Sequence, residues 1–471
     1  MSNYFKISKF FLFIPLLGVA IVSTSTLFPF IVGKYVIFRS SVALALLFFC
    51  LGVLFSKNDK AVFDRIKSVL KSPLVISVMA FVASFVLAGF FGVAPSFSFW
   101  SNFERGLGSL ELLHFLVFFF LMVFHFREGK DWSKFFGWAI FGGVLMALYG
   151  ILAASGFNGF LGGKWSDAGF RFSGSIGNPA YVAVFSLFLI FYVLYLLSVK
   201  YRGKMKESGA VFLMVLGVFF LVIFAFAATR GAFLGLIAAI LAFLFYAGIA
   251  SKRWRIKFIG AAMVVAAIVV ILVAFKNVPF IKSLPFSRIF DISLSTKTFE
   301  DRAIMWKMAI DGFKERPVLG WGAENFTFVF DQNFNTAYFK PAEGFGAWFD
   351  RAHNVFFDYL AETGAVGLAA YCAMFVVFFL FLFRNSGITF RKKTGEDKNA
   401  AIQKERHLGV VEGGLLFAVI VSYLVQGIAL FDVGITYINL FIVLAFAAHR
   451  FKSVGGSAVG VRGALGGKDN N

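Results

Sequence analysis

Residues 210–250 read AVFLMVLGVFFLVIFAFAATRGAFLGLIAAILAFLFYAGIA, and Arg230 carries the single charge in this stretch. A helix needs about 20 mostly apolar residues to cross the hydrocarbon core of a bilayer. The stretch therefore predicts two consecutive membrane-spanning helices, over 210–229 and 231–250, with only a tight turn at Arg230-Gly231 where they meet. One long kinked helix is the alternative that so short a separation leaves open.

The rest of the chain has the same apolar character. Of its 471 residues, 59% are hydrophobic, 69 are Phe and only 15% are charged. A soluble protein of this length needs more charge to cover its surface, so a soluble fold, disorder, a coiled coil and a disulfide scaffold are excluded. We predict an all-α polytopic membrane protein with about 12 spanning helices, at 10–32, 35–56, 73–93, 107–126, 135–155, 179–198, 210–229, 231–250, 258–276, 362–383, 409–430 and 433–449.

Basic residues predict the orientation of these spans. If the N-terminus lies in the cytoplasm and the spans alternate, the cytoplasmic segments carry 29 Lys and Arg but 9 Asp and Glu. The opposite orientation would reverse this bias, so we predict that both termini are cytoplasmic. The excess equals the whole formal net charge of +20, which is therefore a topology signal and indicates no nucleic-acid partner.

This topology divides the chain into one membrane domain, residues 1–453, and a tail, 454–471, which we expect to be disordered in the cytoplasm. The longest hydrophilic stretch, 277–353, becomes an outer loop. Within it, residues 300–316 have an apolar stripe at helical spacing, and Pro317 ends the predicted helix. Such a helix would lie along the membrane interface or pack on the tops of the spans, and it is either a packed connector or a helix that contacts substrate.

The outer loop ends in Arg-Ala-His-Asn at 351–354, close before a span. Of the five histidines, His353 is the one at the predicted outer face. Asp350, Asp358 and Glu362 are near enough in sequence to orient its imidazole, whose pKa suits proton transfer near neutral pH. We therefore predict a general base at His353, with a purely structural histidine as the alternative.

Two arginines stand at the predicted outer boundary. Arg171 lies in the glycine-rich stretch GFRFSGSIGNP, where the backbone can approach a ligand closely and Asn178 precedes the next helix. Arg230 sits in an apolar turn, and such an arginine usually faces a polar cavity or an anion. A guanidinium can donate two parallel hydrogen bonds to a phosphate, although snorkelling toward headgroups is the alternative for both residues. Arg39 and Glu111, inside spans, are expected to form a structural ion pair.

Two outer arginines beside one outer histidine suit a lipid-linked diphosphate whose head lies outside the membrane. No carboxylate cluster in the sequence predicts a metal site, and the cytoplasmic segments contain no phosphate-cradling nucleotide loop. Cys50 and Cys372 lie in apolar spans and are expected to be small core residues. A transporter or flippase would instead place ionisable residues near the membrane midplane and would have two related halves of sequence. A structural or sensor protein would leave the arginines and the histidine at the predicted outer face unexplained.

Four blocks of sequence carry a resemblance to a known family. They are Arg171 with Gly177-Asn178-Pro179, Thr229-Arg230-Gly231, the region from Arg302 and Trp306 through RPVLGWG to Asn325-Phe326, and His353-Asn354 followed by Tyr359-Leu360 and Glu362-x-Gly364-x-x-Gly367-Leu368. With the blocks in this order and in a membrane context, the chain resembles the O-antigen ligase and polymerase superfamily of bacterial membrane glycosyltransferases over about residues 140–450.

This resemblance implies a GT-C-type membrane glycosyltransferase that is metal-independent, uses no cofactor and inverts the anomeric carbon in a single displacement. Its donor would be a glycan on undecaprenyl diphosphate, at the outer, periplasmic face of the bacterial cytoplasmic (inner) membrane. Arg171 and Arg230 would bind the diphosphate and stabilise charge on the leaving group, and His353 would be the base. Asn178, Arg351 and Asn354 are further predicted substrate-binding residues, although the family suggests no role for Arg351.

The acceptor stays open among three kinds of family member. A ligase transfers the glycan to a lipid A-core sugar, a polymerase to another lipid-linked repeat, and a protein O-oligosaccharyltransferase to a Ser or Thr hydroxyl. All three share the sequence blocks, so we take the ligase, which names the superfamily, as the expected function. Membrane lipid is the other expected partner, and a lipid-linked glycan flippase is the rival from another functional class.

Overall fold

The computed structural model describes residues 3–56, 59–253, 255–282, 287–290, 297–338, 348–386 and 408–451. Across these residues the regular structure is entirely helical, as the composition predicts. The predicted tail, 454–471, lies outside the described residues.

Nine helices in the described part of the chain are long and apolar enough to cross a membrane. They are α3 (Val32–Leu54), α5 (Pro73–Phe90), α8 (Gly129–Ala154), α9 (Pro179–Lys200), α10 (Ser208–Ala227), α11 (Arg230–Ala250), α12 (Arg255–Ala274), α16 (Val355–Asn385) and α18 (Val410–Gly427). Two shorter apolar helices, α7 (Ser109–His125) and α19 (Gly434–Arg450), join them. Each of these helices overlaps a predicted span, in agreement with a polytopic membrane protein.

The first predicted span, 10–32, is not one helix. The chain forms α1 (Asn3–Phe11) and α2 (Ile14–Gly18), and no helix covers residues 19–31. Because proline has no N–H to donate, Pro15 sits in the first turn of a new helix and does not continue α1. The remaining short or polar elements are α4 (Asp59–Leu70), α6 (Pro95–Trp100), α13 (Pro279–Lys282), α14 (Lys297–Glu315), α15 (Phe326–Gln332) and the 3₁₀ turns η1 (Gly174–Ile176), η2 (Ser287–Phe290) and η3 (Thr336–Tyr338).

α10 and α11 are two separate helices, which excludes the single kinked helix. Ala228, between them, has a φ of 44°, in the left-handed region that interrupts an α-helix. α10 then packs on α9, whereas α11 packs on α18. The two helices therefore diverge from the turn that carries Arg230.

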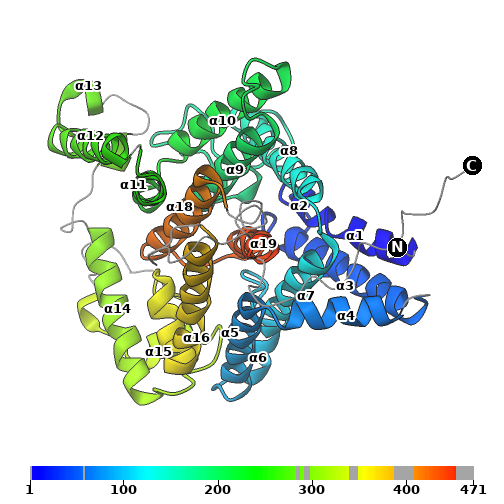
Figure 1. Ribbon diagram of the computed structural model, residues 1–471. Coiled ribbons are helices and arrows are strands. Elements are labelled where there is room, and N and C mark those ends of the chain that lie inside the picture. Colours follow the sequence, from blue (N-terminus) through cyan, green and yellow to red (C-terminus); the bar gives the residue numbers. More distant parts are fainter. Residues whose placement is uncertain are drawn as a thin grey trace, which may run out of the picture.

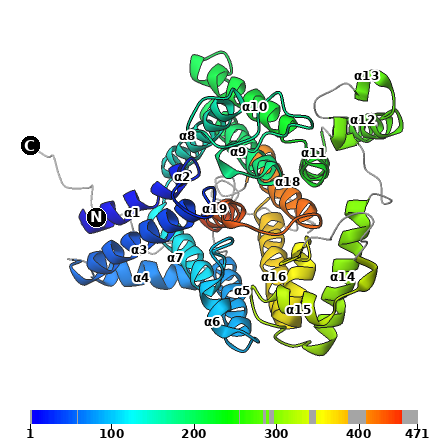
Figure 2. The same cartoon turned by 180° about the vertical axis from the view of Figure 1, so that it is seen from behind.

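α19 lies at the centre of the bundle (Figure 1), where it packs against α5, α7, α9, α16 and α18. Every side chain from Leu440 to Ala447 is 0% exposed. A helix that is apolar all round is stable only when it is covered on every side, so this segment forms the core. α12 is the opposite case: it packs on α11 at the edge of the molecule (Figure 2) and buries none of its residues, as expected of a lipid-facing helix.

Two predictions about residues inside spans have different outcomes. The Arg39–Glu111 ion pair is confirmed, because Arg39 Nε lies 2.5 Å from Glu111 Oε2. The prediction for the cysteines is wrong: Cys50 and Cys372 are both exposed on the surfaces of α3 and α16 rather than buried in the core. A thiol is apolar enough for a surface that faces lipid, so an apolar span does not by itself place a cysteine inside.

α16 is broken at Gly364, where φ is 62° and ψ is −165°. The turn that begins at Pro317 docks into this break through backbone hydrogen bonds, from Trp321 N to Ala361 O (3.0 Å) and from Ala365 N to Pro317 O (2.9 Å). A Cβ at Gly364 would stand 2.4 Å from a backbone oxygen of the same turn, so only glycine permits this approach. The docking holds the region between α14 and α15 against the segment that contains His353.

The helix predicted over 300–316 is α14, and it packs on α16. Met305, Met308 and Ala309 are buried against α15 and α16. On the neighbouring face, Trp306 Nε1 donates a hydrogen bond to Ala352 O at 3.1 Å. Of the two predicted placements, packing on the bundle is therefore the observed one, and α14 reaches the backbone next to His353.

Candidate active site

Several sequence-predicted residues meet at one end of the bundle. We call the end at which α7, α9, α11, α16 and α19 begin the site end; it corresponds to the predicted outer face. The connection between α18 and α19 lies there and brings the helix starts together, since Phe431 packs on both His353 and Tyr181. Ala429 in the same connection packs against Gly231.

His353 occupies the residue before the N-cap of α16. Its φ of 55° lies in the left-handed region, which non-glycine residues rarely adopt. Such a conformation persists only when its surroundings enforce it, and it often marks a functional site. Asn354, the next residue, caps α16: its Oδ1 accepts hydrogen bonds from Phe356 N at 3.0 Å and Phe357 N at 3.4 Å.

Neighbouring groups hold the imidazole of His353 in one orientation. Its Nδ1 lies 3.2 Å from Arg351 O, and because a carbonyl can only accept, Nδ1 carries the proton and Nε2 keeps its lone pair. Phe349 and Phe431 pack edge-on against the ring, each at 5.0 Å between centroids. Burial lowers the pKa of His353; the bond to Arg351 O opposes this shift, and the charge of Arg302 adds to it.

Arg351, two residues before His353, is buried, and both terminal nitrogens of its guanidinium pair with carboxylates. It is 6% exposed, donates from Nη1 to Glu362 Oε1 at 2.6 Å, and forms a second ion pair with Glu324. Although burial opposes its charge, Glu324 and Glu362 raise the pKa of Arg351 well above its ordinary value. Glu324 played no part in the sequence prediction, because it lies far from His353 in the chain and approaches only through the docked turn.

Both backbone polar groups of Ala352 form hydrogen bonds with side chains. Its N–H donates to Asp358 Oδ1 at 2.6 Å, and its carbonyl accepts from Trp306 Nε1 at 3.1 Å. Together with the Arg351 ion pairs, these bonds fix the residue before His353 from α14 and α16 at once. The surrounding structure thus enforces the unusual backbone of His353.

Asn178 also caps a helix. Its Oδ1 accepts a hydrogen bond from Ala180 N at 2.9 Å at the start of α9, and the residue is exposed at the site end. Like Asn354, it uses its side-chain oxygen within the protein, which leaves the amide N–H groups for other contacts. Substrate binding by Asn178, Arg351 and Asn354 stays a prediction.

Arg171 reaches the turn that carries Arg230. Its Nε donates to Ala227 O at 3.1 Å and its Nη2 to Thr229 Oγ1 at 2.8 Å. The neighbouring backbone reinforces this placement, because Phe172 N donates to a carbonyl of α10 at 3.0 Å. The structure thus brings together the two arginines that the sequence only placed on the same face.

Arg302, on α14, is a third cation in the same place. Burial lowers its pKa and the charge of Arg230 lowers it further, while Arg302 in turn acts on His353. No carboxylate among the described residues lies within ion-pair distance of Arg302. The sequence predicts no specific role for Arg302. Its spacing of four residues from Trp306, which puts both side chains on one face of α14, is the signal that could have pointed to the site.

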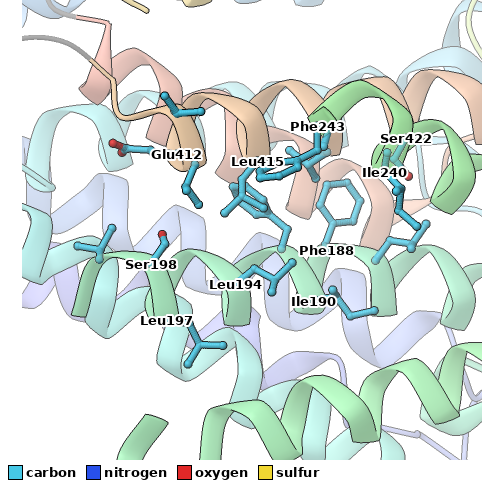
Figure 3. Close-up of a pocket in the computed structure, with 18 of the residues that line it drawn as sticks. Phe188, Ile190, Leu194, Leu197, Ser198, Ile240, Phe243, Glu412, Leu415 and Ser422 are labelled. Carbon is cyan, nitrogen blue, oxygen red and sulfur yellow. The ribbon is translucent and has the colours of Figure 1, made fainter. Parts of the chain in front are cut away.

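An apolar groove of about 1170 Å³ runs between α9, α11 and α18. Figure 3 shows Phe188, Leu194, Ile240, Phe243 and Leu415 projecting into it, with Glu412 and Ser198 toward one end and Ser422 toward the other. The Ser422 end adjoins the start of α11, since a Cβ on Gly235 would lie 3.1 Å from Ser422 O. The groove therefore leads along the bundle toward the turn that carries Arg230.

Residues 213–372 match a family model described as O-antigen ligase. The match runs from α10 into α16 and includes Arg230, Arg302 and His353, whereas Arg171 precedes it. No curated protein sequence matches the chain. Within its polytopic helical bundle, the chain therefore contains a region, residues 213–372, that is similar to the O-antigen ligase family.

Proposed function

We propose that the protein is a membrane glycosyltransferase that moves a glycan from undecaprenyl diphosphate to an acceptor hydroxyl at the outer face of the bacterial cytoplasmic membrane. One observation carries the proposal: a neutral histidine with a free Nε2 stands beside clustered arginines at the end of an apolar groove. The O-antigen ligase domain supports glycosyl transfer over transport by a flippase.

The groove and the arginines together suit a polyprenyl diphosphate. The apolar walls of the groove would take part of the polyprenyl chain, and the diphosphate would lie at Arg171, Arg230 and Arg302. Guanidinium groups bind phosphate oxygens through charged, paired hydrogen bonds. Because negative charge grows on the diphosphate as it leaves, the same groups would stabilise the transition state.

The proposed reaction is a single displacement. The acceptor hydroxyl oxygen attacks the anomeric carbon, its proton passes to His353 Nε2, and the bond from that carbon to the phosphate oxygen breaks. The bonding electrons leave with undecaprenyl diphosphate, and the anomeric configuration inverts. Since arginines meet the charge of the leaving group, we expect transfer to need no metal ion and no cofactor.

Arg351 and Asn354 are better explained as positioning residues than as direct substrate contacts. Both ends of the Arg351 guanidinium bind protein carboxylates, and Asn354 Oδ1 caps α16. Each holds the backbone on one side of His353. A change at either residue would therefore act through the position of the imidazole.

The acceptor that names the family is a lipid A-core sugar, and we propose this acceptor first. A lipid-linked repeat, as in a polymerase, and a protein hydroxyl are the alternatives, because all three acceptors present a hydroxyl to the same base. The test is transfer by purified protein in lipid nanodiscs, with an undecaprenyl-diphosphate oligosaccharide as donor, each acceptor in turn, and EDTA present. Absence of transfer to all three acceptors, with a donor that binds, would overturn the proposal.

A further inference from the structure

A second cavity, of about 270 Å³, lies at the site end. Its walls come from the starts of α3, α7, α9 and α19 and from the connection between α6 and α7. In the described chain it shares no lining residue with the apolar groove. Glu104, with a side chain that is 46% exposed, and the exposed Asn178 belong to its lining, so part of the wall meets solvent.

The side chain of Phe431 lies between this cavity and His353. The ring of Phe431 that packs on His353 at 5.0 Å also carries the Arg105 guanidinium at 4.9 Å and the Tyr181 ring at 5.9 Å. Arg105 and Tyr181 both line the cavity. Arg105 is further tied to the His353 loop by a bidentate pair with Asp350, with Nε–Oδ2 of 2.7 Å and Nη2–Oδ1 of 3.0 Å.

Tyr181 brings an unused hydroxyl to the cavity wall. The residue is 6% exposed, yet no described residue forms a hydrogen bond with its hydroxyl. Because the described protein leaves this hydroxyl without a hydrogen-bond partner, it can bond to a ligand in the cavity. The rings of Phe30 and Tyr35 add apolar faces to the same lining. A sugar ring presents both an apolar face and hydroxyl edges, and this combination matches it.

The charges in the lining favour a neutral ligand over a second phosphate. Lys34 donates from Nζ to three carbonyls, of Ile21 at 2.6 Å, Phe30 at 2.8 Å and Ser175 at 2.7 Å. Arg105 is paired with Asp350; although burial opposes its charge, the hydrogen bond to Asp350 and the charge of that carboxylate together raise the pKa of Arg105. The volume also falls just below the range of about 300–1,000 Å³ for drug-sized ligands, which suits a single sugar residue.

We propose that this cavity binds the terminal sugar of the acceptor glycan, an inference that rests on the proposed transfer reaction. The donor would reach His353 from the arginine cluster and the acceptor from the cavity behind Phe431. The segment 171–178 joins the two, because Arg171 contacts the Arg230 turn at one end and Asn178 lines the cavity at the other. Two separate cavities would hold the donor glycan on one side of His353 and the acceptor glycan on the other.

The test measures glycan binding and transfer separately. Saturation-transfer NMR on nanodisc protein would detect lipid-free core oligosaccharide, and we expect the signal to be lost in Ile435→Trp, which fills the cavity. Tyr181→Phe removes one oxygen without changing the fold, and we expect its acceptor KM to rise about tenfold, as one lost sugar hydrogen bond implies, with the donor KM unchanged. Ile76→Trp, at a side chain that is 52% exposed on α5, is the matched control.

Three outcomes would overturn the proposal. They are an unchanged glycan signal in Ile435→Trp, an unchanged acceptor KM in Tyr181→Phe, and displacement of the glycan by undecaprenyl diphosphate, which would place it in the donor groove. Failure of the transfer reaction itself is a different result, since wild-type protein would then bind glycan in the NMR experiment without producing any glycosylated acceptor.

Discussion

His353 has an unusual left-handed backbone and a ring that can accept a proton. A single substitution can remove the ring and keep the backbone conformation. Asparagine tolerates the left-handed conformation that His353 adopts, but it cannot take up a proton. In His353→Asn we expect kcat to fall by about 10²–10⁴-fold, the usual contribution of a general base, with Tm unchanged. His114→Gln, at a half-buried histidine of α7, is the control. Near-normal transfer by His353→Asn would remove the proposed base.

The pH dependence of transfer should follow the lowered pKa of His353. The base works only when deprotonated, and burial keeps its pKa below the ordinary value of about 6.5, so kcat/KM should be flat near neutrality and fall only in acid. Removing the charge in Arg302→Gln should raise that pKa and move the acid limb to higher pH. Arg316→Gln, which removes a charge stacked on Trp321, should leave the limb in place. A profile that does not respond to Arg302→Gln contradicts the assignment.

The arginine cluster predicts weaker donor binding in three variants. Arg171→Ala, Arg230→Ala and Arg302→Ala should each raise the inhibition constant of undecaprenyl diphosphate about tenfold or more, because each removes charged hydrogen bonds to the diphosphate. The double variants should be less than additive, since the three groups share one ligand. Product inhibition of wild-type protein and of Arg316→Ala provides the reference. An unchanged inhibition constant would remove that arginine from the donor site.

At the scale of elements, the break in α16 places the loop with His353. Gly364 has a backbone conformation that is nearly restricted to glycine, and a Cβ there would stand 2.4 Å from Val318 O. Gly364→Ala should therefore destabilise the protein by about 3 kcal/mol or more. Gly260→Ala in α12, where a Cβ meets nothing within 4 Å, should leave Tm unchanged or slightly higher. The measurement is the midpoint of thermal unfolding in detergent, and equal midpoints for the two variants would contradict this account.

Most of the apolar helices were predictable from sequence, because apolar length and proline position are local properties. The span over 231–250 and the helix over 300–316 are examples, and α11 and α14 occupy them. The first span failed for a reason that is visible in the sequence, namely Pro15 within the apolar run. The docking of the Pro317 turn into α16 was not predictable. It is made by backbone hydrogen bonds, and every residue other than proline carries the same backbone donor and acceptor, so the sequence does not show which groups pair.

For the whole molecule, the distribution of basic residues predicts the orientation in the membrane, and a direct test is available. In a variant without Cys50 and Cys372, a thiol at Asn335→Cys should react with an impermeant maleimide from the periplasmic side. Lys130→Cys, at an exposed position on α8, should react only after the membrane is opened. The reverse pattern of labelling would invert the bundle and move the site end to the cytoplasm.

The sequence alone determined the membrane class, most of the spans and His353 as the candidate base, because apolar length and residue chemistry are read along the chain. Tertiary structure decided which cations surround that base. Arg171 contacts the Arg230 turn, Arg302 joins them from α14, and Glu324 holds Arg351 beneath the loop. These groups are far apart in sequence, and only the packing of α9, α11, α14 and α16 at one end of the bundle brings their charges within range of one another.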